Sequence, residues 1–223
     1  MNETLRQARV SALTLFVFAL VATALMAGVY ALTHRIVAAN EQAARLAIVS
    51  QVLPAGGYDN DPARAAVTLS AADGRRLGND GPSQVYIARL GGRMVARVFE
   101  ATAPNGYAGR IRLLVGVDAQ GAITGVRVVS HKETPGLGDY IDRAKSDWID
   151  QFNGLALTRD SEWKVKKDGG RFDAMAGATV SPRAVVGAVA NTLRFVAAER
   201  TKPGQWDAPV SYTHLTLPTI CSV

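Results

Sequence analysis

Residues 84 to 129 carry the run that decides the fold of the outer part of this chain: QVYIARLGGRMVARVFEATAPNGYAGRIRLLVGVDAQGAITGVRVV. Its first half holds two segments rich in apolar and β-branched residues, Gln84 to Leu90 and Arg93 to Glu100. Gly91 and Gly92 separate them, and two glycines between strand-like runs are typical of a tight β-hairpin. We therefore predict an antiparallel pair here.

The second half of the run repeats this organisation. From Arg110 to Val117, apolar residues alternate on one face with a period of two, which is the pattern of a half-buried strand. Asp118 to Gly121 supplies turn residues, and Ile123 to Val129 is the returning strand. Two successive hairpins favour an antiparallel sheet.

Helical patterns follow the strands, and the clearest is the last one. Ser181 suits an N-cap and Pro182 the first helical position. An apolar stripe then runs through Val185, Val189, Leu193 and Val196. Three elements are expected after the Gly-rich loop 131–138: a helix over 139–152, a strand over 162–167 and this final helix to about residue 200. The fold class is α+β, with a mixed, largely antiparallel sheet and packed helices.

Composition excludes several classes of function. The chain has 223 residues, of which 48% are hydrophobic, and a single cysteine, Cys221. One cysteine excludes an intramolecular disulfide, a cysteine-ligated zinc site and an iron–sulfur cluster. The net charge of +6 is dispersed. The densest basic stretch, Arg159 to Arg171, interleaves acids and reads as a solvated strand face, so we expect no nucleic-acid binding.

An uncharged apolar stretch, Val10 to Thr33, precedes the domain. As a helix it would span about 36 Å, enough to cross a bilayer with some tilt. Tyr30 suits an interfacial aromatic, and the weak charge asymmetry favours an N-terminus inside. A cleaved signal peptide, with a mature chain beginning near Met26, is the alternative. We expect residues 1–9 in the cytoplasm, a membrane helix over 10–33, a stalk helix over 34–57 and one domain over 58–208.

Small residues gather in DAMAGATVSP, from Asp173 to Pro182, directly before the last helix. Small side chains let the backbone approach a ligand, and a helix N-terminus offers unpaired N–H groups to an anion. This pattern predicts a phosphate or anion site around Thr179 and Ser181. A tight packing turn that starts a helix is the alternative from composition alone. No metal site is indicated.

DAMAGATVSP resembles the flavinylation motif of the FMN-binding domain family, in which the motif threonine carries FMN through a phosphoester. HKETPGLG, from His131 to Gly138, is similar to the family's loop along the isoalloxazine ring, and Gly106 to Gly109 (GYAG) is similar to its strand entrance. The resemblance implies covalent FMN on Thr179, attached by a separate flavin transferase. Ala176 departs from the Ser or Thr common before Gly-Ala-Thr.

The resemblance also implies roles for single residues. Asp173 would be read by the transferase, or would only cap the loop. Ser181 contacts the phosphate, caps the helix, or does both, beside Gly177 and Ala178 of the motif.

In the upstream loop, backbone N–H groups would bond the polar edge of the flavin while Leu137 covers a face. Glu133, Thr134, Leu137 and Gly138 are the candidates, unless the loop is only a rigid turn. Tyr107 either stacks on the ring or is a core or rim aromatic. We assign no catalysis to His131.

Within the family, the length and the continuation after Pro182 most resemble the G subunits of the ion-translocating Rnf electron transport complexes. The C subunits of sodium-pumping NADH:quinone oxidoreductases are the near alternative. The resemblance implies a single-pass inner-membrane electron carrier with a periplasmic domain, in a complex that couples ferredoxin and NAD to ion transport. Alone, such a subunit would not catalyse that exchange. A flavin redox sensor or a flavin-free scaffold domain stays open.

The last residues, 209–223, are interpreted as a non-native tail. Ser211 to Val223 carry no charge and resemble an out-of-frame or adapter-derived translation. Deleting that stretch is expected to change neither flavin content nor stability.

Overall fold

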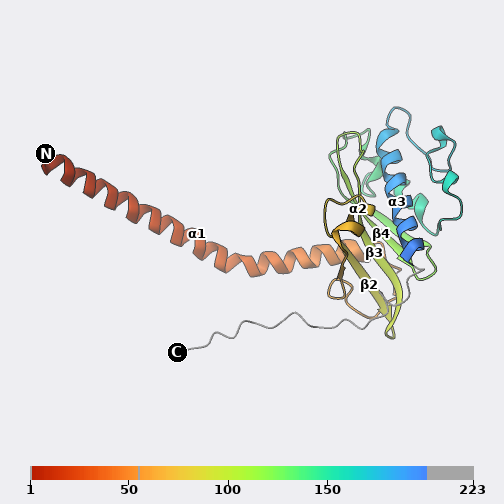
Figure 1. Cartoon of the computed structure of the whole chain (residues 1–223), viewed down its shortest axis with the longest axis horizontal. Coiled ribbons are helices and arrows are strands. Elements are labelled where there is room, and N and C mark those ends of the chain that lie inside the picture. Colours follow the sequence, from red (N-terminus) through yellow and green to blue (C-terminus); the bar gives the residue numbers. More distant parts are fainter. Residues whose placement is uncertain (1, 55, 200–223) are drawn as a thin grey trace. The chain divides into compact units, whose positions relative to one another are not determined.

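The computed structural model describes residues 2–54 and 56–199 (Figure 1). They fall into two compact units that divide between Arg45 and Leu46. The predicted tail lies outside the described residues.

Helix α1 spans Asn2–Ser50. Its residues up to Arg45 form the first unit, and its last residues belong to the second unit. Its stretch Ser11–Ala31 has a mean hydropathy of 2.4 and is long and apolar enough to cross a membrane. Inside it, the Thr23 hydroxyl donates a hydrogen bond to the carbonyl oxygen of Ala19 at 2.8 Å. The predicted N-terminal apolar helix is confirmed.

The second unit is built on one antiparallel sheet with the strand order β1-β2-β3-β4-β5. All four strands of the two predicted hairpins are present, and β1 was not predicted. Gly91 and Gly92 take φ values of 56° and 78°, the left-handed conformation that a tight hairpin between β2 and β3 requires. The strands are β1 Val67–Thr68, β2 Gln84–Leu90, β3 Arg93–Ala103, β4 Ile111–Asp118 and β5 Ile123–Ser130.

Helix α3, Val180–Glu199, covers one face of this sheet (Figure 1). Its apolar stripe packs on β3 and β4, and Phe195 meets Phe99 of β3 edge to face, with ring centroids 6.0 Å apart. Short helix α2, Ala71–Arg76, is capped by the Ser70 side chain, which accepts from the Asp73 N–H. This packing brings the first residues of α3 close to other segments from the second half of the chain.

The opposite face of the sheet receives the end of α1 and the residues after it. Val49, Val52 and Leu53 pack there against a second apolar cluster. Gly116 and Gly125 are cross-strand partners on β4 and β5, and a Cβ on Gly116 would collide with the carbonyl oxygen of Val52. Paired glycines therefore form the niche that holds the end of the stalk helix.

Two predicted elements between β5 and α3 are wrong. Residues 139–152 do not form one helix but two 3-10 turns, η1 Asp139–Ile141 and η2 Asp147–Phe152, because Asp142 is extended and Ser146 caps the second turn. Residues 162–167 do not form a strand: η3 Asp160–Glu162 and η4 Lys166–Asp168 occupy this region, with a single bridge at Val165. The basic stretch is thus a set of turns with local ion pairs, including Arg159 to Glu162 at 3.7 Å.

Candidate flavin site

A cavity of about 350 Å³ opens at the start of α3. The structure brings together in its wall all the cofactor-binding residues predicted from the sequence except Thr179, which stands between two lining residues. Val180 is the additional member. The lining residues are Tyr107, Glu133, Thr134, Leu137, Gly138, Gly177, Ala178, Val180 and Ser181.

A tight turn presents Thr179 at this cavity. The Ala178 N–H donates to the Met175 carbonyl oxygen at 3.1 Å, and Gly177 in the turn has φ +84°. A positive φ at the third turn position favours glycine, which explains the Gly before Ala-Thr. The Thr179 carbonyl oxygen accepts the Arg183 N–H at 3.1 Å, so Thr179 is the N-cap of α3.

Ser181 therefore lies inside the helix, and its prediction as the N-cap is wrong by two positions. Its side chain is buried and donates to the Glu133 carboxylate over 2.5 Å. The hydroxyl thus joins α3 to the loop after β5 instead of capping the helix.

Glu133 connects three segments that are distant in sequence. Besides the Ser181 hydroxyl, its carboxylate accepts the Ala108 N–H at 3.1 Å, and its side chain is 4% exposed. A Cβ on Gly138 would lie 3.0 Å from the Glu133 Oε2 atom, and a Cβ on Gly106 would lie 2.7 Å from its Oε1 atom. The two glycines therefore leave room for this carboxylate.

The loop after β5 closes on itself through its backbone. The carbonyl oxygen of Thr134 accepts the N–H groups of Leu137 and Gly138, and the turn contains Pro135 followed by Gly136 with φ +75°. The Glu133 N–H donates to Nδ1 of His131 at 3.1 Å. These three N–H groups have acceptors within the loop. The expectation that backbone N–H groups of this loop bond the flavin stays a prediction.

Tyr140, from η1, holds the other side of the motif turn. Its hydroxyl accepts the Met175 N–H at 3.0 Å and donates to the Ala178 carbonyl oxygen at 3.2 Å. Burial raises the pKa of Tyr140, and the bond from Met175 opposes this only in part. The phenol thus stays protonated at neutral pH and able to donate.

The backbone of Asp173 is anchored on both sides. Its carbonyl oxygen accepts the Trp148 indole N–H at 2.6 Å, and its N–H donates to the Gln151 side chain at 2.9 Å. The carboxylate faces outward and pairs with Lys166 at 2.6 Å, both side chains being 61% exposed. Asp173 is therefore accessible at the surface and not part of the cavity wall.

The rim of the cavity is apolar and open. Tyr107 is 74% exposed, which excludes a core position, and Leu137 is 52% exposed. Both side chains line the cavity and are open to solvent. Among residues 2–54 and 56–199, no group of three or more His, Cys, Asp or Glu side chains gathers as a metal site.

Sequence reasoning missed Tyr140, Gln151 and the structural role of Glu133. A buried tyrosine generally needs a partner for its hydroxyl, and this was the one signal that could have identified Tyr140. Nothing local marks Gln151, because its partner lies 22 positions away.

Similarity to known proteins extends over most of the chain. The family model described as FMN-binding domain matches residues 106–194, and the model of the RnfG N-terminal region matches residues 1–52. The G subunit of the ion-translocating oxidoreductase complex of Pseudomonas aeruginosa strain UCBPP-PA14 is 50% identical over 194 residues, covering 86% of this chain and 90% of the relative. Its counterpart in Yersinia pestis is 47% identical over 195 residues, covering 86% and 91%. With this identity over most of both chains, the protein belongs to the family of ion-translocating oxidoreductase complex G subunits.

Proposed function

We propose that this protein is a membrane-anchored electron-carrier subunit that holds FMN through a phosphoester to the Thr179 hydroxyl. The observation that carries the proposal is the cavity at the start of α3, whose wall unites the three segments that resemble the FMN-binding domain family. When bound, FMN supplies the capacity to exchange one or two electrons.

The first turn of α3 fits a phosphate group. Among the described residues, the backbone N–H groups of Thr179, Val180 and Ser181 have no acceptor. Unpaired N–H groups and the positive end of the helix dipole favour an anion at this position. Gly177 and Ala178 beside them add no bulk, so a phosphate on Thr179 can approach the backbone.

The surrounding residues hold this helix start in place. Glu133 holds it through the Ser181 hydroxyl, and Tyr140 holds it through the Ala178 carbonyl oxygen. Leu137 and Tyr107 at the rim supply apolar area for the faces of the ring.

Thr179 needs an external enzyme for its modification. Within the described part of the chain, no side chain accepts a hydrogen bond from its hydroxyl, and an unactivated hydroxyl is a poor nucleophile. A separate flavin transferase, which would recognise the exposed Asp173, answers this need. The Lys166 ammonium paired with Asp173 would have to move aside.

The cellular setting follows from the family and from α1. We place the chain in the inner membrane as a single-pass protein, its domain in the periplasm, within a complex that couples electron transfer between ferredoxin and NAD to ion transport. The match of residues 1–52 to the RnfG N-terminal region favours this over the C subunit of a sodium-pumping NADH:quinone oxidoreductase.

Mass spectrometry tests the attachment directly. Trypsin cleavage after Arg171 and Arg183 releases a peptide, Phe172 to Arg183, that contains the motif. After coexpression of the full chain with a flavin transferase, we expect this peptide to carry the added mass of an FMN phosphoester, with fragmentation placing it on Thr179. Thr179→Val should abolish the mass, and Thr179→Ser, which keeps a hydroxyl, should retain part of it. An unmodified wild-type peptide, or a mass that persists in Thr179→Val, would refute the proposal.

A further inference from the structure

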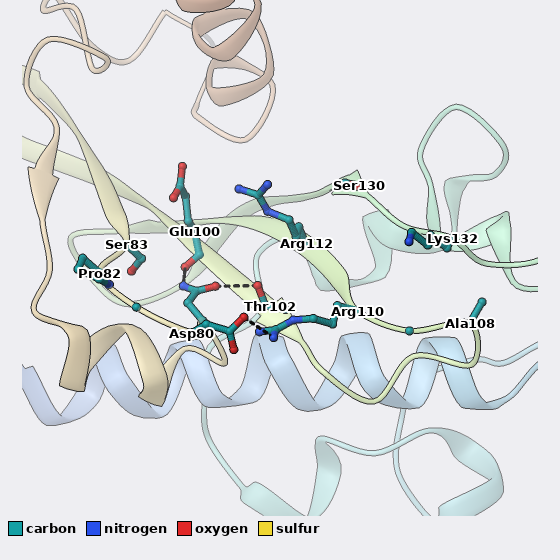
Figure 2. Close-up of a pocket in the computed structure, with 13 residues that line it drawn as sticks. Asp80, Pro82, Ser83, Glu100, Thr102, Ala108, Arg110, Arg112, Ser130 and Lys132 are labelled. Atoms are coloured by element: carbon teal, nitrogen blue, oxygen red, sulfur yellow. Dashed lines mark hydrogen bonds and ion pairs between the residues drawn. The ribbon is translucent and has the colours of Figure 1, made fainter.

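A second hollow, of about 530 Å³, lies beside the flavin cavity and has a different chemistry (Figure 2). We define it as the basic groove. It is bounded by the loop after α2, the end of β3, the entry to β4 and the end of β5. Its lining residues are Asn79, Asp80, Gly81, Pro82, Ser83, Glu100, Thr102, Ala108, Gly109, Arg110, Arg112, Ser130 and Lys132.

The acidic groups of the groove are already engaged. Asp80 pairs with Arg110 at 2.5 Å. The Glu100 carboxylate accepts the Tyr86 hydroxyl at 2.8 Å and the Gln84 N–H at 3.3 Å. Each carboxylate of the groove therefore already has a partner.

Its remaining cations are free. Arg112 and Lys132 are exposed, and neither forms an ion pair or side-chain hydrogen bond with any residue in the described ranges. Arg112 stands between Thr102 and Ser130 in the register of β3, β4 and β5. Figure 2 shows its guanidinium projecting away from the pair of Asp80 with Arg110.

The groove also contains a buried hydroxyl that can donate a hydrogen bond. Ser83 is 3% exposed, and its hydroxyl has no hydrogen-bond partner among the described residues. An unpaired buried hydroxyl costs free energy that a ligand or water can recover. Two cations without partners in the described part of the chain, beside a hydroxyl that can donate, favour a negatively charged occupant.

The basic groove and the flavin cavity share two stretches of wall. Tyr107 lines the cavity and Ala108 the groove, and in the same way Glu133 lines the cavity and Lys132 the groove. Whatever occupies the groove therefore lies beside the flavin cavity.

We propose that the basic groove docks an acidic segment of a neighbouring subunit and so places an electron-transfer partner beside the flavin. An exposed ion pair contributes little to affinity, so two such cations would hold a free small anion weakly. A segment that is already held in a complex loses less translational and rotational entropy on binding. Charge complementarity then fixes its position. The role of the partner in electron transfer rests on the proposed function. The acidic character of the docked segment does not.

A zero-length cross-link tests that chemistry on the assembled complex in membranes. A water-soluble carbodiimide joins the Lys132 amine to a carboxyl group only when the two are in contact. We expect an amide between Lys132 and an Asp or Glu of another subunit, absent in Lys132→Arg. Only intrachain products, or protection of Lys132 by inorganic phosphate at constant ionic strength, would overturn the proposal. This readout does not depend on flavin, whereas the FMN mass on Thr179 tests the proposed function separately.

A charge reversal tests the consequence. Arg112→Glu with Lys132→Glu should lower the rate of flavin reduction in the complex, per flavin bound, by about tenfold at low ionic strength. The deficit should shrink as salt screens the charges. The milder Arg112→Gln with Lys132→Gln should give a smaller deficit in the same direction. Arg93→Glu with Lys145→Glu, the same change of charge at exposed sites outside the groove, is the control. Equal rates for the groove and control variants at every ionic strength would overturn the proposal.

Discussion

The Glu133 carboxylate offers a quantitative test of how the flavin site is assembled. It accepts hydrogen bonds from the Ala108 N–H and the Ser181 hydroxyl, and so joins the segment before β4 to the start of α3. The perturbation is a double-mutant cycle of Glu133→Ala, Ser181→Ala and both together. The cycle isolates the interaction between the two side chains, since other effects of each truncation cancel.

The expected magnitudes follow from burial. Glu133 is 4% exposed and Ser181 2% exposed, so solvent cannot replace a lost partner. A hydrogen bond to a charged group contributes about 1.5 to 3 kcal/mol. Glu133→Ala removes two of them and should cost about 3 to 5 kcal/mol, while Ser181→Ala removes one and should cost about 1.5 to 3 kcal/mol. The coupling energy should be about 1.5 to 2.5 kcal/mol.

The assay is urea unfolding of the full chain in detergent, followed by tryptophan fluorescence and extrapolated linearly to water. Glu133→Gln is the matched control, because it keeps the shape and an acceptor oxygen while removing the charge. It should cost about 1 kcal/mol. If the two alanine substitutions add to within about 0.5 kcal/mol, the buried contact does not hold the site together and the reasoning fails.

Three further predictions concern the surroundings of the site. Tyr140→Phe removes the bridge to the motif turn and should cost about 1 to 2 kcal/mol, with a lower fraction of FMN-modified peptide by mass spectrometry; unchanged modification would contradict a positioning role. Gly116→Ala forces a Cβ against backbone in the stalk niche and should cost about 2 to 4 kcal/mol by urea unfolding, whereas Gly187→Ala, in open space on α3, should be neutral or stabilising. Arg183 donates hydrogen bonds that lower the pKa of Asp168 below its unperturbed 3.8, so this contact stabilises the fold above that pH and is lost as the pH falls through the lowered value. Asp168→Asn should therefore flatten the acid side of the unfolding profile, and an identical profile would refute the linkage.

The sheet could be predicted because its signals are local. The strands of the two predicted hairpins are short runs rich in apolar and β-branched residues, with a period of two in Arg110 to Val117, and the glycine pair between β2 and β3 has the positive φ that its tight turn needs. Strand β1 escaped prediction because its two residues, Val67 and Thr68, are too short to show a period. Its pairing with β2 depends on tertiary contacts and not on a local sequence pattern.

The failures between β5 and α3 have a common cause. Residues 139–152 contain good helix formers, but an aromatic cluster determines their path: Trp148 packs edge to face on Tyr140, with ring centroids 5.7 Å apart, and Phe152 lies 4.7 Å from Phe172. These contacts hold residues 139–152 in their observed path. They also connect this segment to Phe172, which follows the second wrongly predicted segment, residues 162–167. The periodicity of a sequence does not reveal these ring contacts. Packing of large aromatic rings outweighs the small differences in helix propensity between residues.

The glycines of the candidate site show where composition reaches its limit. Sequence reasoning treated the small residues of DAMAGATVSP as room for a ligand. Gly177 also supplies the positive φ of the turn before Thr179, and Gly136 does the same in the loop after β5. Gly106 and Gly138 have a different reason: a side chain at either position would press on the Glu133 carboxylate. The three motif segments are therefore one structural unit, built around a buried acid, and replacing either glycine by alanine should impair the same contact that the double-mutant cycle measures.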